Sequence, residues 1–340
     1  YAPWIYIGIT SVISVIVMYL IGKKLENEKL GLLLALLMAL SPAELGPITG
    51  LSNPNLVPIT ASLSLLLFIL LIKNKLSMPL IFIWGILIGI GINNHLQMIG
   101  LLFLPVVLFT YKKFPRICIL VFGIGLLFTF IPLLYFNLTH DWHTVRGIIY
   151  FQEVGKYAVH APNRWLFYLR DFWPNFWAYV IGVPIVLGYI TFVYSGIVVL
   201  YMAFKKRFKP IYLLLFVAFF LNVIFLRYFS GPRENYYFIY LHPFLILFFG
   251  WALFQSFRNK LLFFPGAIIL TAFLLFVLKE DVGRLRSEDK YLGYREQTEN
   301  IITYFPNKTF QIYYCGKDDR IRSQSIAFLL YNEHLLDSKG

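Results

Sequence analysis

The sequence predicts an all-α polytopic membrane protein, with about ten transmembrane helices of a single membrane domain and the start of a small extracytoplasmic α/β region. Two observations lead to this fold class. Of the 340 residues, 59% are hydrophobic and 14% are charged, and apolar stretches close to the ~20 residues that cross a bilayer core recur along the chain. The basic residues, which give a formal charge of +13, gather in short segments between these stretches, where they direct topology. We therefore expect no nucleic-acid partner.

Ten apolar segments are the predicted spans of a membrane domain that covers residues 1–278. Each is a run of apolar residues of helical length. The predicted bounds are 2–22, 29–45, 56–72, 79–93, 95–111, 117–137, 178–204, 210–227, 237–255 and 261–278.

Basic loops follow every second predicted span. Lysine and arginine concentrate in residues 22–29, 73–75, 112–116, 205–209 and 258–260. This alternation places all five loops on one face, which the positive-inside rule assigns to the cytoplasm. The longer polar segments then share the extracytoplasmic face. The sequence therefore predicts a multi-pass membrane protein with its active side outside and membrane lipids around it. The short basic loops resemble those of bacterial or archaeal plasma-membrane proteins, so we expect such a membrane.

The longest outer loop, residues 138–177, is expected to contain short helices along the membrane surface. Its stretch "RWLFYLRDFW" (164–173) can place five apolar residues on one face, which are Trp165, Leu166, Leu169, Phe172 and Trp173. One interpretation is an aromatic belt at the level of the lipid headgroups. The other is a lid over a lipid-linked substrate.

Two further segments have a local pattern. "HDWH" (140–143) spaces two histidines by three, and on a helix both can bind one metal, although no third ligand is evident beyond Asp141. A divalent metal is therefore a candidate cofactor, and no metal-site residue is assigned. The tail 279–340 has helical patterns at 294–305 and 323–336 and a strand pattern at 309–315, which predict an incomplete α/β region.

Ionisable groups at the outer edge of the spans are the strongest functional signal in the chain. Arg227, Arg233, Glu234 and His242 surround the stretch "RYFSGPREN", and Tyr237 follows it. Charges close to a bilayer are costly to bury, so they pair with each other or mark functional sites. Two arginines beside tyrosine hydroxyls suit a phosphate group. The alternative is a structural pair, such as arginine with glutamate or with a headgroup phosphate.

Five segments together resemble the GT-C membrane glycosyltransferases of the protein mannosyltransferase type, a family that includes the aminoarabinose transferases of lipid A. The resemblance rests on the order of these segments and on their common topology. They are "MYLIGKKLENEKLGLLLALLMALSP", "LSNPNLVPITASLSLLLF", "GILIGIGINNHLQMIGLLFLPVVLF", "FNLTHDWHTVRGII" and "RENYYFIYLHPFLIL".

The resemblance implies that a polyprenyl-phosphate sugar is the donor and that transfer to an acceptor proceeds with inversion on the outer face. A carboxylate must remove a proton from the acceptor hydroxyl. In the family this acid lies in the first outer loop, which we expect upstream of Tyr1. Within the chain, Glu44 and Asp141 are the candidate substitutes.

The resemblance also implies roles for other residues. Cations must stabilise the departing phosphate, and Arg227 and Arg233 are the candidates, with Tyr237 and His242 in support. His95, Asn53 and Asn55 are expected to line the sugar or acceptor side. The predicted substrate-binding residues are therefore these three together with Arg227, Arg233, Tyr237 and His242.

Other functions fit the same composition. A transporter or flippase of lipid-linked sugars is also polytopic and basic inside, but it should have broken helices near the midplane or matching halves. A surface-polysaccharide polymerase or ligase uses the same lipid carrier. A non-catalytic membrane scaffold is a further alternative, because fold alone does not determine a reaction.

Overall fold

The computed structural model of the protein consists of helices. It describes residues 2–45, 53–74, 76–155, 164–206, 208–227, 235–287, 299–300 and 302–304, and no strand occurs within these ranges. The chain divides into two compact units, Tyr1–Val277 and Leu278–Gly340. The predicted strand at 309–315 and helix at 323–336 lie outside the described residues, so the α/β character of the tail stays a prediction.

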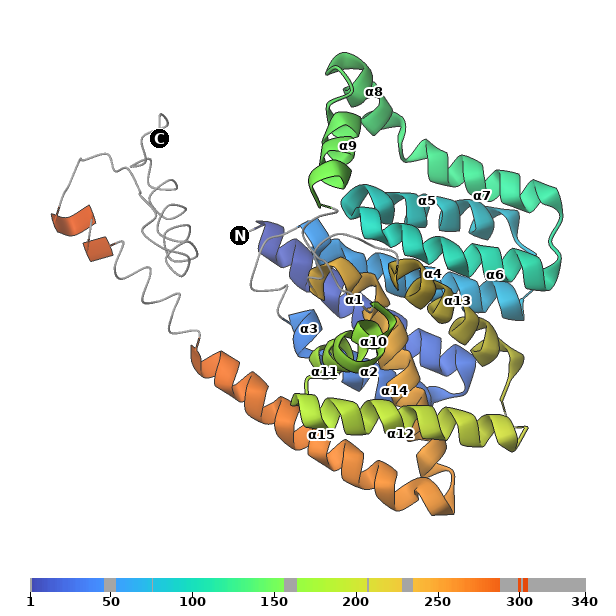
Figure 1. Ribbon diagram of the computed structural model, residues 1–340, viewed down its shortest axis with the longest axis vertical. Coiled ribbons are helices and arrows are strands. Elements are labelled where there is room, and N and C mark those ends of the chain that lie inside the picture. The colour runs from blue at the N-terminus through green and yellow to red at the C-terminus, as the bar shows by residue number, and fades with distance from the viewer. Residues whose placement is uncertain are drawn as a thin grey trace. The chain divides into compact units, whose positions relative to one another are not determined.

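The first half of the chain forms the helices up to α8 (Figure 1). They are α1 (Ala2–Leu25), α2 (Glu28–Ala39), α3 (Pro42–Leu45), the 3₁₀ helix η2 (Asn53–Leu56), α4 (Val57–Lys73), α5 (Met78–Asn94), the 3₁₀ helix η3 (Leu96–Leu102), α6 (Phe103–Lys112), α7 (Arg116–Phe128) and α8 (Ile131–Thr139).

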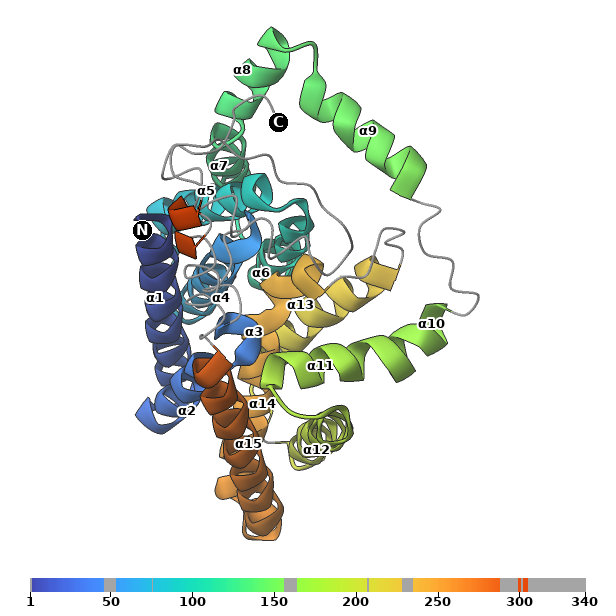
Figure 2. The ribbon, with the colours of Figure 1, turned by 90° about the vertical axis from the view of Figure 1, so that its left-hand side faces the viewer.

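The second half begins with helices of the long loop and continues with longer apolar helices. They are α9 (His143–Gly155), α10 (Arg164–Leu166), the π-helix η4 (Phe167–Phe172), α11 (Trp173–Ile181), α12 (Ile185–Phe204), α13 (Pro210–Arg227), the 3₁₀ helix η5 (Asn235–Leu241), α14 (His242–Phe257) and α15 (Lys260–Ser287). Figure 2 shows α11 crossing above α12.

Local sequence signals determine where several helices begin. Proline occupies the first or second position of α4, α5, α8, α11 and α14, where its missing N–H is no loss and its fixed φ favours the helix. At the start of α2, the Asn27 side chain accepts a hydrogen bond of 3.1 Å from the Leu30 N–H. Such a cap satisfies a backbone donor that the helix itself leaves unpaired.

α14 lies at the centre of the bundle. The stretch Tyr237–Phe257 is 94% buried, whereas Ile185–Phe204 and Lys260–Lys279 are 33% and 17% buried. α14 packs against α1, α2, α4, α11 and α12. A helix that is apolar on all sides belongs in such a position, because every face has a neighbour to bury it.

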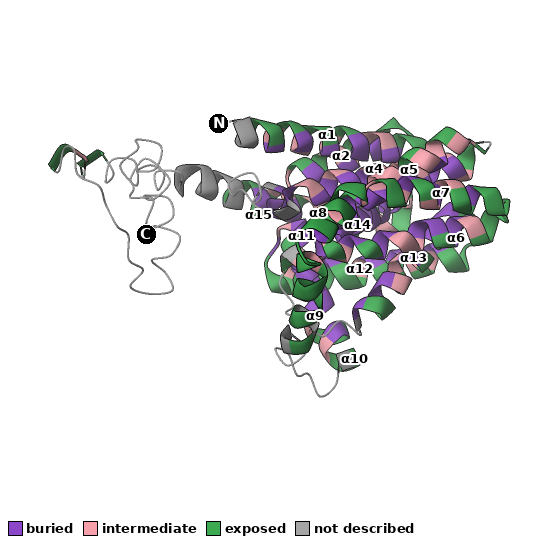
Figure 3. Cartoon of the chain, turned by 90° about the horizontal axis from the view of Figure 1, so that it is seen from above, coloured by how far each residue is buried: buried purple, intermediate pink, exposed green. Residues whose placement is uncertain are grey.

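Large apolar side chains are exposed on the outer helices. On α1, Ile9, Val12 and Ile16 are exposed, and α7, α12 and α13 carry similar residues. Figure 3 shows exposed residues, in green, along α1 and α6. Soluble proteins rarely expose apolar surface of this extent, whereas lipid tails solvate it.

Four described helices are long and apolar enough to cross a membrane, and these are Ile5–Leu25, Ile185–Phe204, Tyr237–Phe257 and Lys260–Lys279. α7 and α8 make a fifth if they form one span with a 47° bend. The shorter apolar helices are Val57–Lys73, Met78–Asn94, Leu96–Lys112 and Pro210–Leu226. This is the architecture of an all-α, multi-pass integral membrane protein, as the sequence predicts.

The structure corrects two local predictions. Residues 178–204 are not one helix, because α11 ends at Gly182 in the left-handed region (φ +79°) and α12 starts after Pro184. Glycine adopts this conformation at little cost, and proline cannot continue the preceding helix.

The apolar face predicted for residues 164–173 is also wrong. Trp165, Leu166 and Leu169 are exposed, whereas Phe172 and Trp173 are buried. Residues 167–172 form a π-helix, whose hydrogen bonds join residues five apart, so the usual helical period does not apply.

Glycines allow α5 and α7 to pack at backbone contact. A Cβ atom on Gly125 of α7 would lie 2.4 Å from the Phe82 carbonyl oxygen, and one on Gly85 of α5 would lie 2.2 Å from the Phe122 carbonyl oxygen. Small residues have this role at close crossings of membrane helices.

We predict that Gly125→Leu lowers the stability of the folded protein by about 1–3 kcal/mol, because the side chain would collide with backbone atoms of α5. Gly123→Leu is the matched control, since nothing lies within 4 Å of a Cβ atom there. Thermal unfolding in detergent should show a lower Tm for Gly125→Leu alone. Equal Tm values for the two variants would contradict this account of the α5–α7 packing.

Candidate functional site

Glu44 and His242 form a buried pair where α3 meets the start of α14. The His242 Nδ1 and Glu44 Oε1 atoms are 2.6 Å apart, although the residues are separated by 198 positions in the sequence. Their side chains are 0% and 9% exposed. A carboxylate in such surroundings needs a cation or donor beside it, because an unpaired buried charge is costly.

α11 closes one side of this pair. The rings of Phe176 and Tyr179 lie 5.5 and 5.9 Å from the imidazole ring of His242. The Ser41 hydroxyl donates a hydrogen bond of 2.6 Å to the Val180 carbonyl oxygen. These contacts attach the short α3 segment to both α11 and α14.

The second imidazole nitrogen of His242, Nε2, bears on whether the pair can transfer a proton. Nε2 is buried and has no hydrogen-bond partner among the described residues. A histidine that is oriented by a carboxylate is the usual form of a base, but a base must reach the proton that it removes. In this conformation the pair anchors α3 on α14.

η5 gathers the other segments that carry predicted site residues. It packs against η2, which contains Asn53 and Asn55, and against η3, which follows His95. The rings of His95 and Tyr237 are 5.7 Å apart, and Asn55 is buried. Since His242 directly follows η5, four of the predicted segments lie around one end of α14.

A second polar contact fixes η5 in place. The Tyr240 hydroxyl donates to Asn222 Oδ1 of α13 at 3.0 Å, and both residues are fully buried. A Cβ atom on Gly100 would lie 2.2 Å from Asn222 Oδ1, so only glycine leaves room for this contact.

The remaining predicted residues are distributed differently. Arg227 is the last residue of α13, and the carbonyl oxygen of its neighbour Leu226 accepts a hydrogen bond of 2.7 Å from the Tyr168 hydroxyl. Arg233 lies outside the described residues, as does Glu234. Asp141 is exposed in the turn between α8 and α9, with a φ of +50°, so it does not join the buried pair.

The "HDWH" motif does not form the helix on which the metal prediction depended. His140 follows the last residue of α8, His143 begins α9, and the two residues between them have positive φ. The ring of His140 stacks on Phe136 at 4.2 Å. Among the described residues no group of three or more His, Cys, Asp or Glu side chains could hold a metal.

Sequence reasoning missed the contacts that assemble this site. Tyr168, Phe176 and Tyr179 were not among the predicted site residues, yet Tyr168 contacts α13 and the other two contact His242. Phe176 and Tyr179 are three residues apart on α11, so their shared helix face was the available signal, whereas Tyr168 lies in the π-helix and its spacing gives none.

No protein-family model, curated protein or solved structure matches this chain.

We predict that Glu44→Leu lowers the free energy of unfolding by about 3–5 kcal/mol, because His242 loses its partner inside the bundle. The double variant Glu44→Leu/His242→Leu should be less destabilised than the sum of the two single variants, as expected for contacting residues. Glu28→Gln is the control, since the Glu28 side chain is 68% exposed. The free energy of unfolding of all four variants is measured in mixed micelles. If the effects of Glu44→Leu and His242→Leu simply add in the double variant, the pairing is contradicted.

Proposed function

We propose that this chain is the membrane region of an inverting glycosyltransferase, which moves a sugar from a polyprenyl-phosphate donor to an acceptor on the extracytoplasmic face. The observation that supports the proposal is the grouping of η2, η3, η5 and the Glu44–His242 pair around the start of α14. These segments carry residues that the family resemblance assigns to the substrate site. In the proposal, the lipid-linked donor binds at this group of segments.

The separation of this group from the basic loops also supports the proposal. His242 begins α14 and Arg258 follows its last residue, so the 16-residue helix sets them about 24 Å apart along its axis. At the far end, Lys73 donates to the Lys24 carbonyl oxygen and Lys209 pairs with Glu26. α6 and α12, which lead into the basic segments 112–116 and 205–209, both end on the right-hand side of Figure 1.

In this proposal, Arg227 and Arg233 bind the donor phosphate and stabilise it as it leaves, with Tyr237 in support. His95 and the η2 asparagines line the sugar or acceptor side. His242 has a positioning role, because its Nδ1 is engaged by Glu44. The base is then a carboxylate of the family's first outer loop.

The proposal includes the finer topology. We infer ten crossings, with the shorter apolar helices inserted beside the longer ones, basic loops in the cytoplasm and the 279–340 segment in an extracytoplasmic α/β region. Helices occupy each of the ten predicted segments, which supports this arrangement.

Loss of Arg233 should reduce transfer at least tenfold in the full-length protein. A hydrogen bond to a charged group contributes roughly 1.5–3 kcal/mol, which corresponds to about 10–150-fold in rate. The assay uses proteoliposomes with polyprenyl-phosphate mannose or polyprenyl-phosphate glucose and measures release of polyprenyl phosphate.

Arg116→Ala, at a basic turn, is the matched control for Arg233→Ala and should keep wild-type turnover. Equal turnover in both variants would contradict the assignment of Arg233 to the donor phosphate. Movement of intact lipid-linked sugar between the leaflets, without release of polyprenyl phosphate, would establish a transporter instead.

The topology predicts which single cysteines a membrane-impermeant maleimide reaches. In a Cys118→Ser/Cys315→Ser background, His140→Cys should be labelled in intact cells. Lys112→Cys should be labelled only after the membrane is permeabilised, because positive loops stay inside. Both positions are exposed, so accessibility of the side chain does not limit the comparison. The reverse labelling pattern would invert the proposed topology.

A further inference from the structure

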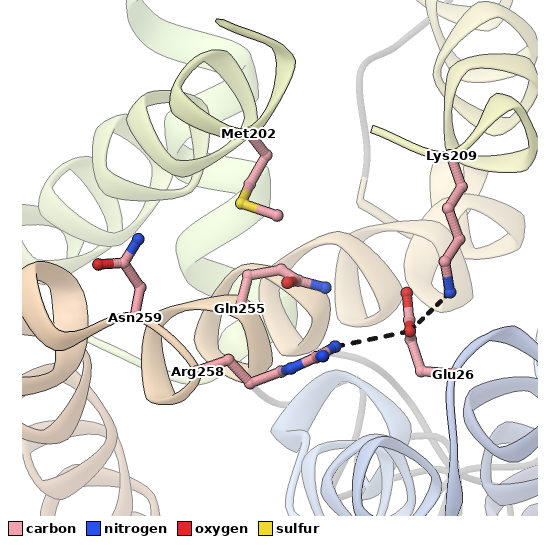
Figure 4. A pocket seen from close by; sticks show the side chains of 6 residues that line it. All are labelled: Glu26, Met202, Lys209, Gln255, Arg258 and Asn259. Carbon is pink, nitrogen blue, oxygen red and sulfur yellow. Dashed lines mark hydrogen bonds and ion pairs between the residues drawn. The ribbon is translucent and has the colours of Figure 1, made fainter. Parts of the chain in front are cut away.

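A cavity at the basic end of the bundle has no role in the proposed transfer reaction. It measures about 360 Å³ and lies between the α1–α2 turn, the ends of α12 and α14, and the start of α13. Its lining residues are Glu26, Met202, Lys209, Gln255, Arg258 and Asn259 (Figure 4). The volume is within the ~300–1,000 Å³ range of pockets that bind small molecules.

The charges around this cavity leave a net positive balance. Lys209 and Arg258 supply two positive charges and Glu26 supplies one negative charge, which leaves +1. The Lys209 Nζ is 2.7 Å from Glu26 Oε2, whereas the Arg258 NH1 is 3.8 Å from it. The latter distance is too long for a hydrogen bond, so the Arg258 guanidinium, with five N–H donors, has capacity for a further anion.

Glu26 is more deeply buried than either cation. Its side chain is 8% exposed, against 52% for Lys209 and 60% for Arg258. Glu26 also accepts a hydrogen bond of 2.8 Å from the Tyr212 hydroxyl. The carboxylate is thus held at the back, and the cations lie between it and the outside.

Neutral groups complete the site. Gln255 is buried, and Figure 4 shows its amide directed toward the space between Arg258 and Lys209. The Arg258 guanidinium lies 5.5 Å from the Phe254 ring centroid, a contact that orients the side chain. An amide donor beside two cations suits the oxygen atoms of a phosphate.

The depth of the cavity in the membrane identifies the class of anion. The cavity lies where the apolar helices α12 and α14 end and α13 begins. In the proposed topology, on which this step rests, that level is the cytoplasmic headgroup layer. Basic pockets between transmembrane helices on the cytoplasmic side bind phosphorylated lipid headgroups. Free phosphate shares this chemistry, but it lacks acyl chains that can contact the exposed apolar faces of the same helices.

We propose that this cavity binds the phosphate of an acidic phospholipid headgroup in the cytoplasmic leaflet. Lys209 and Arg258 contact the phosphate, Gln255 donates to it, and Glu26 limits the affinity by competing for both cations. The site is independent of the proposed glycosyl transfer at the other end of α14.

The test measures retention of phosphatidylglycerol by native mass spectrometry of the full chain, released from nanodiscs that contain this lipid. Lys209→Gln/Arg258→Gln should bind roughly 25-fold more weakly, at about fivefold for each cation near the headgroups. Lys112→Gln/Arg116→Gln is the charge-matched control and should bind like the wild type, because neither residue lines the cavity.

Two single variants separate binding from folding. Glu26→Gln should bind about fivefold more tightly, because the competing carboxylate is gone. If Glu26 serves only to hold Lys209 and Arg258 in place, this variant would instead retain the lipid more weakly, which would contradict the proposal. Met202→Phe should weaken retention severalfold by filling the cavity with the charges unchanged, and its Tm shows whether the protein is folded.

Inorganic phosphate at 10 mM distinguishes the two sources of the anion. The proposal requires that the lipid is retained in its presence. Displacement of the lipid would overturn the lipid assignment in favour of a free-phosphate site. Equal retention by the Lys209→Gln/Arg258→Gln variant and its charge-matched control would overturn the site itself.

Discussion

A carboxylate buried in an apolar bundle must be bound by cations or hydrogen-bond donors, and this requirement acts at both ends of the structure. At one end Glu44 is held by His242 of α14. At the other end Glu26 is held by Lys209 and Tyr212. Each pairing connects segments far apart in the sequence, because no local residue satisfies the charge. Each of the two carboxylates therefore joins the first half of the chain to the second.

The apolar segments of the chain were predictable from the sequence because burial in lipid requires long hydrophobic runs. Helices occupy all ten of them. The break between α11 and α12 was not predicted, although Gly182 and Pro184 are the signals for it. Apolar composition continues through those residues, so hydropathy alone joins the two helices. The buried face of residues 164–173 was likewise not predicted, because the prediction assumes 3.6 residues per turn and residues 167–172 form a π-helix.

The candidate site was predictable as a list of residues but not as an arrangement. Glu44 and His242 were singled out separately, as a substitute base and as a phosphate-binding residue, and their direct contact was not foreseen. No sequence pattern links two positions that are 198 residues apart. The basic segment at 22–29 was interpreted only through its positive charges, whereas its buried acid Glu26 makes the contacts that join the loops.

The burial of α14 has a consequence for how the protein is assembled in the cell. The helices that pack most extensively against it, α1, α2, α4, α11 and α12, all precede it in the chain. A chain is synthesised from its N-terminus, and a domain generally folds as a unit, so these helices are made before the unit can be completed. Until α14 is inserted, the faces of the earlier helices that later pack on it must be covered by lipid or by an insertion chaperone. Completion of the core then coincides with translation of residues 242–257, late in the synthesis of this region.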